Sequence, residues 1–151
     1  MTTDDSADGP ADDSPGGPLD VPTLEVMARH ARSHDLLASW SFRPDSVSPR
    51  RLELRLDGEQ YPAAVDTARL DVRWYEGDDY TFHYVESRGG DRWQCRWDRH
   101  PKPEAPSAHF HPPPDASSTV EPSELDDSHP LGALFDVLDW APARLSTLHE
   151  E

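Results

Sequence analysis

One stretch of this sequence, between Trp93 and Asp115, concentrates side chains that can do chemistry. Its candidates for proton transfer are Asp98, His100, His109 and His111. Imidazole exchanges protons near neutral pH and also ligates metal ions, and the nearby arginines can hold a phosphate with two hydrogen bonds at once. The residue types therefore fit acid–base chemistry, metal binding or phosphate binding, and the sequence alone does not choose between them.

Polar residues that alternate with aromatic ones could bind a substrate beside these candidates. Side chains alternate across a strand, so placing the aromatic residues of three consecutive runs inward turns the positions between them outward. The substrate-binding candidates on this outward face and at its strand end are Arg73, His83, Arg92, Arg96 and Arg99. The alternative is a solvated sheet surface whose arginines pair with aspartates across strands.

The spacing of apolar residues predicts the elements that must position these side chains. Helical spacing after Pro22 predicts an amphipathic helix over roughly 22–37. Strict alternation predicts about five strands, centred on residues 40–42, 52–56, 70–74, 80–84 and 93–97. Short turns between the last three strands favour an antiparallel sheet with one packed face. A second helical stripe begins at Leu131, and we expect Pro142 to interrupt it.

Two segments lack the spacing of regular elements. Six prolines between Pro101 and Pro114 exclude a central strand or helix, so we expect a stiff extended loop that carries two histidines. Residues 1–20 hold six acidic residues and no basic ones, and predict a disordered acidic tail. Residues 21–151 should form a single α+β domain, an antiparallel sheet of about five strands flanked by an N-terminal and a C-terminal helix.

Composition limits the setting of the protein. The 151 residues carry a net charge of −16, and Lys102 is the one lysine. Acidic excess with almost no lysine is typical of a surface that stays hydrated in strong salt, so we expect a halophilic source. No apolar run could span a membrane and no secretory signal is present, which predicts a cytoplasmic protein without a membrane partner. Cys95, the single cysteine, excludes an intramolecular disulfide and should be a small buried hydrophobe.

Roughly residues 50–148 resemble the TumE-type toxins. The resemblance lies in the aromatic strand Tyr80-Thr-Phe-His-Tyr84, the glycine turn after it, the strand end Arg96-Trp-Asp-Arg-His100 and the histidine-bearing segment up to His111. It implies the toxin half of a two-gene toxin–antitoxin module, with a helix-turn-helix antitoxin as the partner. Toxins of such modules are commonly small cytosolic enzymes that act on RNA.

Cleavage of RNA without a metal needs a general base, a general acid and cations around the phosphate. The cluster of Asp98, His100, His109 and His111 would supply the first two, and the arginines the third, so we expect a metal-independent ribonuclease with no cofactor. Two alternatives remain open. The same four residues could form a metal-binding module, or the protein could be a non-enzymatic interaction protein.

Overall fold

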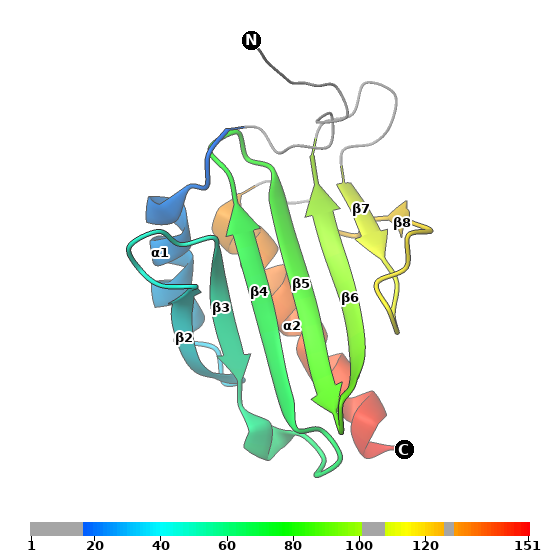
Figure 1. Cartoon of the computed structure of the whole chain (residues 1–151). Coiled ribbons are helices and arrows are strands. Elements are labelled where there is room, and N and C mark those ends of the chain that lie inside the picture. The colour runs from blue at the N-terminus through cyan, green and yellow to red at the C-terminus, as the bar shows by residue number, and fades with distance from the viewer. Residues whose placement is uncertain (1–16, 101–107, 126–128) are drawn as a thin grey trace.

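The structure is a computed structural model that describes residues 17–100, 108–125 and 129–151. Within these residues, seven strands form one antiparallel sheet in chain order (Figure 1). The strands are β2 (Leu37–Arg43), β3 (Arg51–Leu56), β4 (Thr67–Trp74), β5 (Tyr80–Arg88), β6 (Asp91–Arg99), β7 (Ala108–His111) and β8 (Glu121–Pro122). The helices α1 (Val21–Ala31) and α2 (Pro130–His149) lie on one face, and a short 3-10 helix (Gly58–Gln60) follows β3.

The α+β class, the antiparallel sheet and the two flanking helices are confirmed. All five predicted strands are present as β2 to β6. Their alternation also gives the predicted register: Cys95 is fully buried and Trp97 is 5% exposed, while Trp93 on the same face is half-buried. Burial raises the pKa of Cys95 to about 12, so this residue is the small buried hydrophobe that was expected.

The first helix begins as predicted and ends earlier. Asp20 caps it, because its carboxylate accepts a hydrogen bond from the Thr23 amide at 3.1 Å. The helix ends at Ala31 instead of residue 37. Beyond it, amides bond to carbonyls three residues back, as His34 does to Ala31, and this tighter turn directs the chain into β2. Leu36, the last apolar position of the predicted stripe, lies in this turn, and its side chain is buried.

The prediction that no central strand lies between Pro101 and Pro114 was wrong. Residues 101–107 lie outside the described residues, but Ala108–His111 form β7, which pairs with β6 on one side and β8 on the other. These four residues lie between Pro106 and Pro112 and contain no proline, so each keeps the backbone N–H that a ladder requires. The count of prolines over the whole segment overlooked this stretch of residues without proline, Ala108–His111.

Pro142 does not interrupt the second helix, contrary to the prediction. α2 runs through it from Pro130 to His149. A proline removes one backbone hydrogen bond, but apolar residues on both sides of this one, Leu138 and Leu145 among them, are buried against the sheet and α1. Among the described residues, no helix combines the length and the apolar content that a membrane span requires.

The described chain begins just before α1, where Pro18, Leu19 and Asp20 of the predicted tail contact the end of β4 and the residues that follow it; the Pro18 carbonyl accepts from the Glu76 amide at 2.9 Å. Leu19 forms a β-bridge with Tyr75, and the Asp20 amide donates to the Trp74 carbonyl at 2.7 Å. The rest of the predicted tail, residues 1–16, lies outside the described residues. The entry to α1 is therefore tied to the end of β4.

Candidate functional site

The sheet face opposite the helices carries polar side chains in rows across the strands. In one row, Asp71 of β4 pairs with His83 of β5, His83 with Arg96 of β6, and Arg96 with His111 of β7. The neighbouring row runs from Arg73 through Thr81 and Asp98 to His109. Antiparallel pairing thus brings Arg73, His83, Arg92, Arg96 and Asp98 onto one face together with two histidines of β7, whereas Arg99 pairs with the inward Tyr80 at the end of β6.

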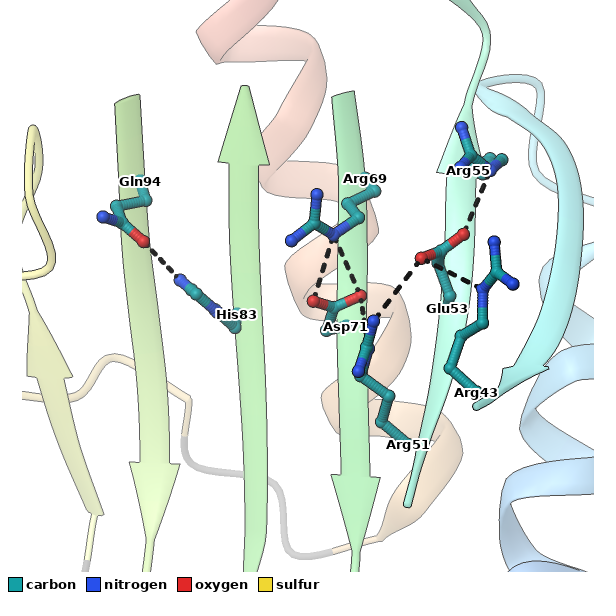
Figure 2. Close-up of polar contacts among 8 residues, drawn as sticks. All are labelled: Arg43, Arg51, Glu53, Arg55, Arg69, Asp71, His83 and Gln94. Atoms are coloured by element: carbon teal, nitrogen blue, oxygen red, sulfur yellow. Dashed lines mark hydrogen bonds and ion pairs between the residues drawn. The ribbon is translucent and has the colours of Figure 1, made fainter. Parts of the chain in front are cut away.

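Toward β2, this open face is a network of arginines around two carboxylates (Figure 2). The Glu53 carboxylate forms ion pairs with Arg55 at 3.0 Å and with Arg43 at 3.6 Å. The Asp71 carboxylate forms ion pairs with Arg69 at 3.1 Å and with Arg51 at 3.4 Å. The carboxylates are only 3% and 5% exposed, since the guanidiniums cover them. The predicted alternative, cross-strand ion pairing, therefore describes this half of the face.

Asp98 is the centre of the other half. Its Oδ2 accepts from Arg96 Nε at 2.9 Å and lies 2.9 Å from His111 Nε2. The other ring nitrogen of His111, Nδ1, donates to the Ser117 carbonyl at 2.8 Å. Both nitrogens of His111 are therefore engaged, and this histidine joins β6, β7 and the chain after β7. Arg96 orients Asp98, and His111 Nε2 contacts both groups, 2.9 Å from Asp98 Oδ2 and 3.3 Å from Arg96 Nη2.

Two histidines next to Asp98 are less constrained. His109 is the β7 residue directly opposite Asp98, and its ring centroid lies 5.7 Å from that of His100. Two buried atoms here have no hydrogen-bond partner among the described residues, Asp98 Oδ1 and His100 Nδ1. Buried polar atoms are normally paired, so unpaired ones beside a cleft are available to a ligand.

A cleft of about 220 Å³ opens at this point. Its wall is made of three arginines, two aspartates, a histidine and three hydroxyl residues, namely Arg73, Arg96, Arg99, Asp79, Asp98, His100, Tyr75, Tyr80 and Thr81. Burial raises the pKa of Tyr75, which keeps its hydroxyl neutral. The cleft is thus lined by three fixed cations, two carboxylates, an imidazole and three hydroxyl groups, a set that can bind a phosphate through the cations and move a proton through the imidazole.

Two predicted substrate-binding residues lie away from the cleft. Arg92 pairs with Ser87 near the β5–β6 hairpin turn, six residues along β6 from Asp98, or roughly 20 Å at the rise of a strand. His83 shares the open face but bonds to Gln94 at 2.7 Å (Figure 2). Burial lowers the pKa of His83 although that hydrogen bond opposes the change, so the ring favours its neutral form.

The sequence did not predict a buried ionic cluster on the helix side of the sheet. Glu86 is fully buried, and Arg144 of α2 binds it with two hydrogen bonds of 2.8 Å each. Tyr84 donates to Glu86 at 2.7 Å, and its hydroxyl meets that of Tyr61 at 2.7 Å. The Arg144 guanidinium also lies 3.5 Å from the centroid of the Trp93 ring. This cluster joins α2 to β5 and β6.

The signal for this cluster was present in the sequence. Glu86 continues the inward positions Tyr80, Phe82 and Tyr84, and Arg144 is the one arginine among 115–151, which hold no lysine. Burial alone would raise the pKa of Glu86, but the hydrogen bonds from Arg144 and Tyr84 outweigh it and lower that pKa. A carboxylate at an inward strand position required a cation on the covering helix.

The metal-binding alternative has no support in the geometry of the described residues. In residues 17–100, 108–125 and 129–151, no group of three or more histidine, cysteine, aspartate or glutamate side chains could hold a metal ion. His100 and His109 lie beside Asp98, but His111 directs both of its ring nitrogens to protein oxygens. The four predicted residues lie close together where the end of β6 pairs with β7.

Comparison with known proteins identifies the family. Neither a search of curated proteins nor one of solved structures gives a match. The family model described as toxin TumE matches residues 27–145, which span most of the sheet and of α2. The match includes the aromatic strand, the end of β6 and the histidines of β7. The chain therefore belongs to the TumE toxin family.

Proposed function

We propose that this TumE-family toxin acts on RNA as a metal-independent ribonuclease, and that its active site is the cleft at the end of β6. The proposal rests on one observation. Asp98 and His100 line a cleft together with three arginines, and His109 lies opposite Asp98 with its ring centroid 5.7 Å from that of His100. Two imidazoles can serve as the general base and the general acid, and the arginines beside them can bind the phosphate, as cleavage of RNA by its 2′-hydroxyl requires.

In the proposed reaction, one imidazole of the His100–His109 pair accepts the proton of a ribose 2′-hydroxyl. The oxygen attacks the adjacent phosphorus, the bond from phosphorus to the 5′ oxygen breaks, and the other imidazole donates a proton to that leaving oxygen. The products are a 2′,3′-cyclic phosphate and a free 5′-hydroxyl. Atoms and protons balance without a further reactant.

Arg73, Arg96 and Arg99 would hold the phosphate oxygens as negative charge develops on them. Arg96 also donates to Asp98, so its planar fork is already oriented. The free oxygen of Asp98, Oδ1, would orient a histidine or the 2′-hydroxyl. His111 is proposed as a positioning residue because its two nitrogens fix Asp98 and the chain at Ser117.

The proposal extends to partner and setting. A toxin of this kind has an antitoxin, and we propose a helix-turn-helix protein encoded beside it. Action on RNA fits the cytoplasm, and the acidic, lysine-poor composition fits a halophilic host.

The first test is growth arrest in a salt-tolerant host, with and without the adjacent antitoxin gene. The wild type should arrest growth and the antitoxin should relieve the arrest. His100→Ala and His109→Ala should each abolish it, because loss of a general acid or base costs about 10²–10⁴ in rate. His30→Ala is the matched control, since His30 is exposed on α1, on the helix side.

The purified toxin should cleave single-stranded RNA in the presence of a chelator, and Arg96→Lys should cut less because an ammonium cannot replace a bidentate fork. Chelator-sensitive activity would favour a metal site. Full toxicity in the folded His100→Ala/His109→Ala double variant would exclude the proposed chemistry. A wild type that does not slow growth would favour a non-enzymatic interaction protein.

A further inference from the structure

A row of arginines crosses the open face and ends at the proposed active site. Arg43 of β2 pairs with Arg51 of β3, and Arg73 of β4 lies next to Arg51, one position beyond the pair Leu52 and Val72. The same row continues through Thr81 and Asp98 to His109. The row spans six neighbouring strands, β2 to β7, and their five spacings of about 4.8 Å put Arg43 roughly 24 Å from His109.

The open face has the opposite charge to the rest of the protein. Its outward strand positions carry seven arginines, Arg43, Arg51, Arg55, Arg69, Arg73, Arg92 and Arg96, against the three carboxylates Glu53, Asp71 and Asp98. These arginines are half of the 14 basic residues in a chain of net charge −16. A cationic face on an anionic protein directs a polyanion to this one side.

The ion pairs on this face leave donors free for a ligand. Glu53 and Asp71 lie beneath the arginines, with side chains 4% and 6% exposed, whereas the side chains of Arg43 and Arg55 are 43% and 48% exposed (Figure 2). A guanidinium has five N–H groups and uses one or two on a carboxylate. The buried carboxylates orient the arginines, and the remaining N–H groups point to solvent.

We infer that this arginine row binds the sugar-phosphate backbone of one RNA strand and leads that strand into the cleft. The inference rests on the proposed ribonuclease function and adds the form of the substrate, a single strand that crosses β2 to β6. The cleft of about 220 Å³ at the end of the row has room for about one nucleotide, so a duplex does not enter. Backbone contacts carry no base specificity.

Binding is measured on a 2′-O-methyl RNA of about 12 nucleotides, within the site sizes of single-strand binders, which cannot be cleaved because its nucleophile is blocked. The test variant is Arg43→Gln/Arg51→Gln, which changes two arginines of the row that do not line the cleft. The matched control is Arg29→Gln/Arg32→Gln, an equal charge change on two exposed arginines at the end of α1, on the helix side. Thermal unfolding confirms that both are folded.

The test variant should bind at least about tenfold more weakly than wild type, given the strength of charge-assisted hydrogen bonds, and the control should not. The slope of log affinity against log KCl should fall by about 0.7 for each lost phosphate contact. Arg43→Lys/Arg51→Lys keeps the charges and should keep the slope. Cleavage of a dinucleotide, which occupies only the cleft, should be unchanged in all three variants.

Equal binding by the test and control variants would overturn the proposed binding of RNA by the arginine row, and it would leave the proposed ribonuclease function untouched. A wild type that prefers duplex RNA to the single strand would also overturn it. A wild type that binds the single strand through these arginines but cleaves neither substrate would overturn the ribonuclease and leave the row in place.

Discussion

At the scale of single residues, Glu86 contributes the most unusual environment in the described chain. It is fully buried, yet it accepts hydrogen bonds from Arg144, Tyr84 and Arg88. Removal of one partner from a buried pair leaves an uncompensated charge, which costs more than the pair itself contributes. The cluster therefore makes the position of α2 on the sheet sensitive to one carboxylate.

We predict that Glu86→Gln destabilises the protein by about 3–5 kcal/mol at neutral pH, because Arg144 keeps its charge without a counter-ion. The folded-state pKa of Glu86 lies below its ordinary value of 4.5. Its contribution is therefore fully present above that value and is lost as pH falls through the folded pKa. Urea unfolding from pH 7 down to acid should show the variant and wild type converging.

Glu25→Gln, at an exposed site on α1, is the control and should change stability by less than about 0.5 kcal/mol. The double variant Glu86→Leu/Arg144→Leu should recover part of the loss, since apolar replacement of a buried pair is often neutral. A constant difference between Glu86→Gln and wild type across the acid range would contradict the ionic explanation.

Sequence reasoning found the polar residues of the cleft and missed this buried cluster for a physical reason. Asp98, His100 and His109 were conspicuous because imidazoles are rare and were close in sequence. Glu86 and Arg144 are 58 positions apart and meet only after α2 packs on β5. Alternation alone showed that Glu86 was inward, but the helix position opposite it required the tertiary structure.

At the scale of elements, β7 decides whether the predicted histidines can act together. Its four residues place His109 opposite Asp98 and His111 opposite Arg96. A free loop would not hold these distances. Alternation predicted β2 to β6 because each has at least two large apolar residues at alternate positions, whereas β7 has the single aromatic Phe110 and β8 only two residues. Such short strands form because they pair with a neighbouring strand, and the periodicity of the sequence does not indicate this pairing.

The junction before α1 gives a prediction at this scale. Deletion of residues 1–16, which lack apolar periodicity, should leave the free energy of unfolding within about 1 kcal/mol. Deletion through Asp20 should cost about 2–3 kcal/mol, because it removes the N-cap and the hydrogen bonds that Pro18 and Asp20 make to the end of β4.

Chemical denaturation of the two truncated proteins measures the difference. Asp20→Ala in the full chain isolates the cap and should cost about 1 kcal/mol. Equal stability of the two truncated proteins would show that the bridge between Leu19 and Tyr75 contributes nothing, and a large loss from the shorter deletion would show that the first 16 residues pack.

At the scale of the whole molecule, charge is arranged in two ways that respond differently to salt. The net charge of −16 favours expansion through self-repulsion. The ion pairs of the open face favour folding, and their carboxylates are almost fully buried, so salt screens them less than it screens the dispersed acidic surface. The balance should therefore shift toward the folded state as salt increases.

We predict that the thermal unfolding midpoint rises as KCl increases from about 0.01 M to 1 M, over which the Debye length falls from about 30 Å to 3 Å. Each 1 kcal/mol of stabilisation should raise the midpoint by about 2–4 °C. The control is Glu25→Gln/Glu59→Gln/Glu150→Gln, which removes three exposed negative charges outside the open face and should gain less from salt. A midpoint that falls with KCl would mean that the ion pairs outweigh the repulsion, and the composition would then not reflect adaptation to salt.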